Sequence, residues 1–571
     1  MAQQLYFSRD TRMFIQFRNT TDNSEAAANL GKGALFEIPI LDGYSFSQTT
    51  NTSEITLAEM ESTAGISRRG RRVFTDSLAP AEWSFSSYVR PFNSLGSNVA
   101  TGIKSADGTG TDVHAVEEVL FASMFGADNY NAGTATFTRA ANPAVTGGAV
   151  ITPAANNSTI VISESNRSAL HSFVIYFLID TAEDNPVVYR LPEAIVNEVS
   201  MDFDVDGIAT LNWSGFAKEI QDVSGGVATA TSAPAYNATT KDGTAIALGD
   251  IFIDTDNVNG RAFHIVNTVP SNSGTVSVTQ AIDEATTSTK NFIRNRLTSV
   301  EIEAAVATDK IASIFGGSHG SISAIDIAND TLTSNGIHNL KTGDQVFITG
   351  GTGNTSLNGT HHFVRVGDES NSYNGTGSPT TKFTLFDTKA NAEDTTSTTG
   401  KVTIASGAYD ANTYKFGNGK YSLVLTGGSF TIANGITFLV PEELGAINKP
   451  LEHVTGTRAA TGTATCYLTL EDSDLTAGTS RQFFNDLVST GAMSQVVNKF
   501  KVTMDIGGSA AAANTTDPAL QIIFPTAHIT VPTHQIEDVI SLETNFEALP
   551  TDFGTADEIT SITYFPVDDY A

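Results

Sequence analysis

Apolar and polar residues alternate along most of this chain with a period of two. The clearest example is the stretch MDFDVDG, Met201 to Gly207, in which Met201, Phe203 and Val205 alternate with three aspartates. Successive side chains of a β-strand point to opposite faces, so the stretch predicts a strand with one core face and one acidic face. Turn-forming Gly, Ser, Thr, Asn and Asp residues recur roughly every ten residues, which indicates a mostly β protein.

Asp202, Asp204 and Asp206, followed by Gly207, also match the start of an EF-hand calcium loop. That loop needs a bidentate carboxylate at its twelfth position, which is Trp213 here, and a helix on each side. An indole cannot ligate calcium and both flanks have a strand pattern, so an EF-hand is excluded. Three alternatives remain for the aspartates: an ordinary solvated face, a functional acidic surface, and a calcium loop of another class.

Two short segments have apolar residues at helical spacing instead. The first follows Asp112, a candidate N-cap, and ends at Gly126; the second runs from Arg481 to Gly491. The apolar positions are Val113, Val116, Leu120 and Met124 in the first segment and Phe483, Phe484, Leu487 and Val488 in the second.

The two helical segments belong to an internal repeat. Residues 40–46 (ILDGYSF) and 424–430 (VLTGGSF) share Leu, Gly, Ser and Phe, and each stretch is followed by strand segments, a short helix and a closing strand pair. The closing pairs begin at Leu191 and Phe524. The shared order favours a duplicated module over a chance similarity between two β segments.

The acidic face of the first closing pair has a counterpart in the second. Apolar residues alternate with polar ones there too, and three of the polar residues are acidic. The apolar residues are Ile536, Ile540, Leu542 and Phe546, and the polar ones are Glu537, Ser541, Glu543, Asn545 and Glu547.

The repeat predicts the domain organisation. Residues 1–222 form the first β module, and residues 291–304 with 416–571 form the second. The turn-rich segment 223–290 is expected to be a linker. Residues 305–415 contain three strand candidates with glycine turns, which predicts a small inserted β-domain.

Charge limits what the protein binds. Thirty-two basic and 62 acidic residues leave a net charge of −30, which is opposite to the basic surface of a protein that grips phosphates. With the single cysteine Cys466, stability must come from packing or assembly. We expect no signal peptide, because the N-terminal stretch MAQQLYFSRDTRMF has no apolar run of signal-peptide length. We expect no membrane span either, because no apolar run reaches the roughly 18 residues that a membrane helix needs.

The motifs of common enzymes are absent from the sequence. It has no Walker A loop, no HExxH, no cysteine pair for zinc and no GxSxG elbow. We therefore expect neither an enzyme nor a bound cofactor or metal. One dense basic run, RRGRR, contains Arg68, Arg69, Arg71 and Arg72. It is interpreted either as a solvated loop or as a loop that docks on an acidic patch of an adjacent ring or subunit.

Four stretches resemble the major tail tube protein of long-tailed, non-contractile bacteriophages, in the type with two tube modules in one chain. They are RRGRRVFTDSLAPAEWSFSSYVRPF (68–92), TLNWSG (210–215), TGGSFTIANGITFLVP (426–441) and AHITVPTHQIEDVISLETNFEALP (527–550). The insertion at 305–415 resembles a small β-domain that decorates phage structural proteins, where it adds bulk or binds a carbohydrate or cell surface.

The resemblance implies β-sandwich modules whose sheets join neighbours into an inner β-barrel. Three chains would form a pseudo-sixfold ring, and stacked rings would form a hollow tube in the virion tail, after synthesis in the host cytoplasm. Its implied partners are further copies of the chain, the tape measure protein, the tail terminator and the tail-tip proteins.

Double-stranded DNA would pass through the tube during ejection without tight binding, because acidic residues of the lumen repel phosphates. The candidate acids are Asp202, Asp204, Asp206, Glu537, Glu543 and Glu547, which would line or border the lumen or lie at an interface, with the outer surface as the alternative. The alternative function is a phage receptor-binding or decoration protein, or a secreted β-domain adhesin.

Overall fold

The structure is a computed structural model, in which most of the chain is built from β-strands, as the alternation predicted. The described residues are 6–60, 67–94, 112–131, 134–139, 149–154, 157–162, 170–179, 186–232, 235–239, 247–254, 262–268, 275–280, 293–304, 320–335, 338, 340, 342–343, 345–349, 351–354, 356–358, 360–367, 381–394, 396–411, 414–417, 420–423, 425–441, 448–469, 480–488, 500–508, 518–550 and 557–565.

The N-terminal module contains one α-helix, α1 (Glu118–Met124), among its described residues. Its strands are β1 (Thr11–Phe17), β2 (Ala34–Ile38), β3 (Ser45–Ser47), β4 (Thr50–Met60), β5 (Ser67–Leu78), β6 (Ala81–Tyr88), β7 (Pro91–Ser94), β8 (Asp112–Ala115), β9 (Asn129–Asn131), β10 (Thr136–Thr138), β11 (Ala149–Pro153), β12 (Ser158–Val161), β13 (Phe173–Ile179), β14 (Val187–Asp204), β15 (Thr210–Ala217) and β16 (Gln221–Asp222).

The C-terminal module likewise contains one described α-helix, α3 (Ser480–Leu487). Its strands are β22 (Ser299–Ala304), β31 (Lys420–Ser422), β32 (Leu425–Ala433), β33 (Thr437–Leu439), β34 (Glu452–Val454), β35 (Ala459–Tyr467), β36 (Phe500–Gly508), β37 (Pro518–Ile529), β38 (Thr533–Gln535), β39 (Ser541–Ala548) and β40 (Ser561–Tyr564).

The two modules have the same strand pairing. In the first, β1 pairs with β2 and β13, β13 with β14, β14 with β15, β15 with β6, and β6 with β3. In the second, β22 pairs with β31 and β36, β36 with β37, β37 with β39, β39 with β35, and β35 with β32. Seven strands of the first module thus have counterparts in the second with the same order of pairing.

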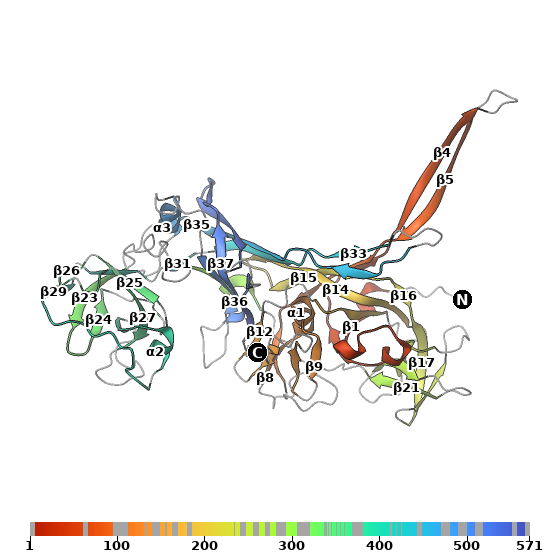
Figure 1. Ribbon diagram of the computed structural model, residues 1–571, viewed down its shortest axis with the longest axis horizontal. Helices are drawn as coiled ribbons and strands as arrows, with labels where there is room; N and C mark the ends of the chain where they lie inside the picture. The colour runs from red at the N-terminus through yellow and green to blue at the C-terminus, as the bar shows by residue number, and fades with distance from the viewer. Residues whose placement is uncertain are drawn as a thin grey trace.

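The modules are joined by one continuous sheet. Strand β14 of the first module pairs antiparallel with β32 of the second, so that Asp202 lies opposite Ser429. This gives an eight-stranded run in the order β3-β6-β15-β14-β32-β35-β39-β38. A second joint is made where β12 pairs with β40. Figure 1 shows the sheets of both modules meeting in the centre of the molecule.

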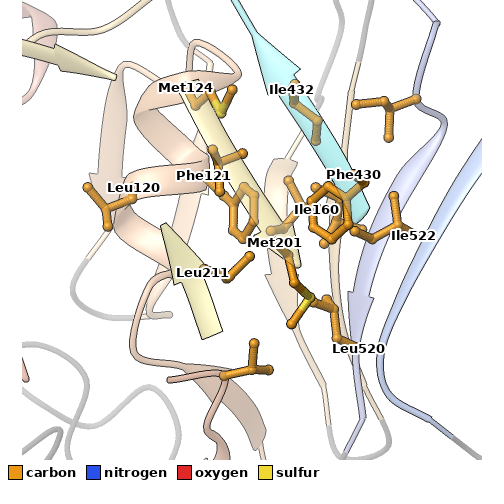
Figure 2. Close-up of a cluster of buried hydrophobic side chains, with 14 of the residues drawn as sticks. Leu120, Phe121, Met124, Ile160, Met201, Leu211, Phe430, Ile432, Leu520 and Ile522 are labelled. Carbon is orange, nitrogen blue, oxygen red and sulfur yellow. The ribbon is translucent and has the colours of Figure 1, made fainter. Parts of the chain in front are cut away.

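One hydrophobic core lies beneath this run and draws on both modules. Phe121 of α1 packs edge-on against Trp213 of β15, with ring centroids 4.9 Å apart. Figure 2 shows α1 facing the strands of both modules across this core. The labelled side chains are Leu120, Phe121, Met124, Ile160, Met201, Leu211, Phe430, Ile432, Leu520 and Ile522.

The first helix begins later than its sequence predicted. Residues Asp112–Ala115 form strand β8, which pairs with β7, and α1 begins only at Glu118, so Asp112 is not its N-cap. Val113, which fits the helical spacing, is buried in strand β8. Its apolar character predicted a helix, whereas pairing with β7 makes this stretch a strand.

The segment expected as a linker, 223–290, forms a closed five-stranded barrel instead. Its isoleucines Ile251, Ile253 and Ile265 are buried against a cluster that includes Phe14 and Tyr176 of the first module. This packing comes from distant parts of the chain and leaves no local sequence signal. The strands are β17 (Ser224–Ser232), β18 (Ala235–Thr239), β19 (Ile251–Asp254), β20 (Ala262–Thr268) and β21 (Thr275–Gln280).

The insertion expected at 305–415 forms a second closed barrel with its own hydrophobic core. Its six strands are β23 (Gly320–Asp326), β24 (Thr331–Ser334), β25 (Gln345–Thr349), β27 (Thr360–Val366), β28 (Lys382–Phe386) and β30 (Lys415–Gly417). The paired strands β26 (Thr352–Gly353) and β29 (Tyr409–Asp410) and the short helix α2 (Lys389–Glu393) complete it.

Candidate functional site

The outward side of the eight-stranded run is a surface of hydroxyls, amides and carboxylates, which we call the polar face. Its rows follow from the register: Asp202 lies opposite Ser429, Ser429 opposite Thr463, and Thr463 opposite Asn545. The residues that alternate with them, such as Met201 and Phe430 in Figure 2, are buried in the core. The polar face therefore crosses from one module to the other without interruption.

The carboxylates of the polar face come from both copies of the repeat. They are Glu82, Glu198, Asp202, Asp204, Glu543 and Glu547. Cross-strand neighbours of the last four are uncharged or histidine: Asp204 lies opposite Gly427, Glu543 opposite Thr465 and Thr533, and Glu547 opposite Thr461 and His528. Like charges directly opposite each other would destabilise a sheet, and this register avoids them.

No lysine or arginine lies on the outward side of the run's described strands. Glu543 accepts a 2.6 Å hydrogen bond from Gln535 Nε2. Among the described residues, no cationic side chain forms an ion pair with Asp202, Asp204, Glu543 or Glu547. The carboxylates thus present uncompensated negative charge to whatever faces this surface.

Two of the predicted acids lie beyond the strands. Asp206 follows the end of β14 in a bend, and its side chain is 81% exposed with Arg296 Nη2 4.0 Å away. Glu537 lies in the turn between β38 and β39, where it lines an open pocket of about 680 Å³ with Asp538 and Gln535. The expectation that Val205 faces the core is wrong: β14 ends at Asp204 and Val205 is exposed in the bend that follows.

A long two-stranded hairpin, β4–β5, projects from the first module, and we call it arm 1 (Figure 1). Its strands pair from Thr50 opposite Leu78 to Met60 opposite Ser67, a length of about 35 Å at roughly 3.3 Å per residue. No other described strand pairs with it. A lone hairpin is marginally stable in water, so arm 1 is suited to packing against another molecule.

The surface of arm 1 combines apolar and basic side chains. Ile55, Val73 and Phe74 are each about half exposed. Arg71 and Arg72 are exposed too, and Arg71 lies 3.7 Å from Glu54 of the facing strand. The basic run is therefore part of strand β5 and not a loop; the side chains of Arg68 and Arg69 lie outside the described part.

The second module has a short hairpin, β33–β34, at the same position in its topology, and we call it arm 2. Arm 2 lies on the first module, where Phe438 is buried in a cluster with Ile195 and Phe216. The loop of arm 2 also reaches the base of arm 1, because Leu78 N donates a 2.8 Å hydrogen bond to Asn448 O. Arm 2 is thus docked within its own chain.

A buried acid also links the modules. Tyr564 Oη of β40 donates a 2.7 Å hydrogen bond to Glu117 Oε1 at the start of α1. Burial raises the pKa of the Glu117 carboxyl to about 7. The next acid, Glu118, contacts His114 Nδ1 at 3.0 Å, and both side chains are buried. These groups are enclosed in the core, which indicates a structural and not a catalytic role.

The described residues contain no group of three or more His, Cys, Asp or Glu side chains arranged to hold a metal ion. Cys466 is buried, and burial raises the pKa of its thiol to about 11. None of the helices in the described ranges has the length and hydropathy needed to cross a membrane.

Comparison with known proteins finds a partial similarity to a phage tail tube protein. No family model matches the chain. The tail tube protein pb6 of Escherichia phage T5 is 33% identical over 141 residues, which are 25% of this chain and 28% of that protein. The match therefore spans about a quarter of the relative's length. It confirms the resemblance to tail tube proteins of long-tailed phages that was predicted from the sequence.

Proposed function

We propose that this chain, similar over a quarter of its length to a phage tail tube protein, is the structural subunit of a phage tail tube. Copies assemble into rings, the rings stack into a hollow tube, and the polar face lines the lumen through which DNA leaves the particle. The observation that supports this function best is the polar face itself. It runs unbroken across both modules and carries carboxylates and hydroxyls but no cation on its described strands.

An acidic lumen suits the transport of DNA. A wall with lysines and arginines would make many phosphate contacts and hold the duplex, whereas carboxylates repel phosphates and keep the channel hydrated. Asp202, Asp204, Glu543 and Glu547 supply this charge from both modules of each chain. The hydroxyls and amides between them bind water without attracting the polyanion.

The ring would be built from repeated modules. Each chain supplies eight strands in one run, so three copies would supply twenty-four strands to a closed inner barrel with pseudo-sixfold symmetry. Closure of a barrel leaves no free edge strand, which removes the aggregation hazard of the open sheet. Arm 1 would pack against the adjacent ring or subunit and bury its apolar residues, with the arginines of β5 steering the contact.

The location in the virion tail and the remaining partners belong to the same proposal. A tube of stacked rings needs a tape measure protein inside it during assembly, a terminator at one end and tip proteins at the other. The two closed barrels, β17–β21 and β23–β30, would decorate the outside of the tube, away from the polar face.

Electron microscopy of the purified full-length chain tests the assembly. The expected result is rings or tubes with threefold symmetry and a channel wide enough for a duplex. Dispersed particles that bind cells or glycans would instead support an adhesin or receptor-binding protein and overturn the proposal.

The charge of the lumen is tested by DNA retention in sedimented tubes. We expect wild-type tubes to release a short duplex, and Asp202→Lys/Asp204→Lys tubes to retain it in a salt-dependent way. Two further double variants each raise the net charge by two units and are compared with each other. Asp202→Asn/Asp204→Asn removes two negative charges from the polar face, and Ser406→Lys/Ala408→Lys adds two positive charges to the exposed surface of the inserted barrel. If both charge-matched pairs retain DNA equally, the polar face does not line the channel.

A further inference from the structure

We infer that strand β38 of one copy pairs antiparallel with strand β3 of a second copy, with Gln535 opposite Ser45 and Thr533 opposite Ser47. The inference rests on the proposed self-assembly and names the two edges and the register that close the ring. The template for this pairing is the β14–β32 junction inside the chain, where a strand at the end of the first module pairs with a strand at the start of the second.

Strands β3 and β38 are the two ends of the eight-stranded run. Among the described residues, β3 pairs only with β6 and β38 only with β39, so each has one side without a strand. Ser45 and Ser47 are exposed, as are all three residues of β38. Exposed edges of this kind are templates for pairing with another chain.

Strand β38 is the counterpart of the end of β14. From the shared start of the closing strand pairs, the stretch MDFD of β14 corresponds to HQIE, which begins in β38. The pairing agrees with this alignment: Ser200 lies opposite Asn212 in the first module, and the equivalent Thr533 lies opposite Glu543 in the second. Strand β38 therefore holds the place that β14 holds at the junction.

Strand β3 is the counterpart of β32 in the same way. The shared pattern of ILDGYSF and VLTGGSF makes Ser45 equivalent to Ser429. Within the chain, Ser429 lies opposite Asp202, whose equivalent is Gln535. Transfer of this pairing to two copies puts Gln535 of one copy opposite Ser45 of the next. Both are on the polar face, so that surface continues across the boundary.

Burial supports the transfer. At the internal junction, the core-side residue Phe203 is 4% exposed, whereas its equivalent after β38, Ile536, is 80% exposed. Met201 is fully buried, whereas its equivalent His534 is exposed. An isoleucine this exposed at the end of an open sheet edge is explained when a second copy covers it as β32 covers Phe203.

Cysteine cross-linking tests the register. Residues directly opposite in an antiparallel pair have Cα atoms roughly 4.5–5.5 Å apart, which fits the distance a disulfide requires. In a Cys466→Ala background, Ser45→Cys/Gln535→Cys should form covalent closed rings under mild oxidation. Ser45→Cys/Thr533→Cys moves one cysteine two residues along the same face, and we expect roughly tenfold less product from that diagonal pair.

The outcomes separate the register from the proposed function. Covalent rings from the Gln535 pair, with little product from the Thr533 pair, establish the inference. Rings or tubes seen by microscopy without that cross-link, or with the Thr533 pair favoured, overturn the register and leave the tube proposal standing. Dispersed chains without cross-links overturn both.

A second variant tests the edge without cysteines. Ile536→Asp changes a side chain that is exposed in the single chain, so the chain should fold normally and fail to form rings, as measured by sedimentation. Ile327→Asp places the same change at an exposed isoleucine of the inserted barrel and should leave assembly unchanged. Normal ring formation by Ile536→Asp would contradict the inference.

Discussion

Arm 1 and arm 2 occupy the same place in the two modules but make different contacts. Arm 1 pairs eleven residues of β4 with twelve of β5 and projects into solvent, whereas arm 2 pairs three residues with three and lies on the neighbouring module (Figure 1). The strands that flank each arm are paired alike. One hairpin of the repeat therefore packs against the neighbouring module of its own chain, and the other projects away from it.

Shortening arm 1 should have the largest effect on assembly of the chain. Removal of residues 53–74, with Thr52 joined to Thr75 by Asn-Gly, leaves two directly opposed residues linked by a favourable two-residue turn. We expect rings that no longer stack into tubes, with a thermal midpoint close to that of the wild type, because none of the side chains described between residues 53 and 74 belongs to the core. Tubes of normal length from this variant would show that arm 1 does not join rings.

The basic strand of arm 1 gives a graded version of the same test. Arg71→Ser/Arg72→Ser should slow tube growth, more so at low salt, and serine at Arg68 and Arg69 as well should increase the effect. Arg9→Ser/Lys389→Ser removes two exposed cations elsewhere and serves as the control. Equal slowing in both double variants would mean that net charge, and not the arm, sets the rate.

For arm 2 we expect the main effect on the stability of the folded chain and not on assembly. Phe438→Ala empties a buried site between the modules and should cost about 3 kcal/mol in the free energy of unfolding. Leu439→Ala, on the exposed side of the same strand, should cost less than about 0.5 kcal/mol. Chemical denaturation of the unassembled chain measures both. Similar losses in the two variants would contradict the docked position of arm 2.

The sequence predicted the parts of this molecule that depend on local alternation. Period two identified the two faces of β14 and β39, and with them four of the six candidate acids on the polar face. The duplicated ILDGYSF pattern indicated the two modules whose pairing is the same. These features are local, since a residue and its neighbours two positions away decide them.

Long-range pairing was beyond the same reasoning. Val205 fits the alternation, yet β14 ends at Asp204 and Val205 is exposed. The chain bends there and brings Asp206 near Arg296, which is ninety residues further along the sequence. The barrel of β17–β21 depends on packing between Ile251 and a cluster that contains Phe14, more than two hundred residues earlier. Whether a hairpin lies on its own chain or projects from it depends in turn on side chains such as Phe438 meeting a distant module.

The buried acid between the modules gives the smallest expected effect, and it depends on pH. The Glu117 carboxyl accepts a hydrogen bond from Tyr564 of the second module, and burial raises its pKa to about 7, above its ordinary value near 4.5. The folded chain therefore binds this proton more tightly than the unfolded chain does. The contribution to stability is complete below about pH 4.5 and is lost as pH rises through 7.

Between pH 5 and 8 this group should remove about 2 kcal/mol from the free energy of unfolding. Arg90 opposes part of the loss, because its charge favours the ionised carboxylate, whereas Glu118 adds to it. Glu117→Gln cannot ionise and keeps an acceptor for the Tyr564 hydroxyl, so its stability should vary less over this range than that of the wild type. Denaturation of both proteins at pH 5 and pH 8 measures the difference. If the variant and the wild type lose stability in parallel, the pH dependence comes from other groups, and the junction of β40 with α1 is held by packing alone.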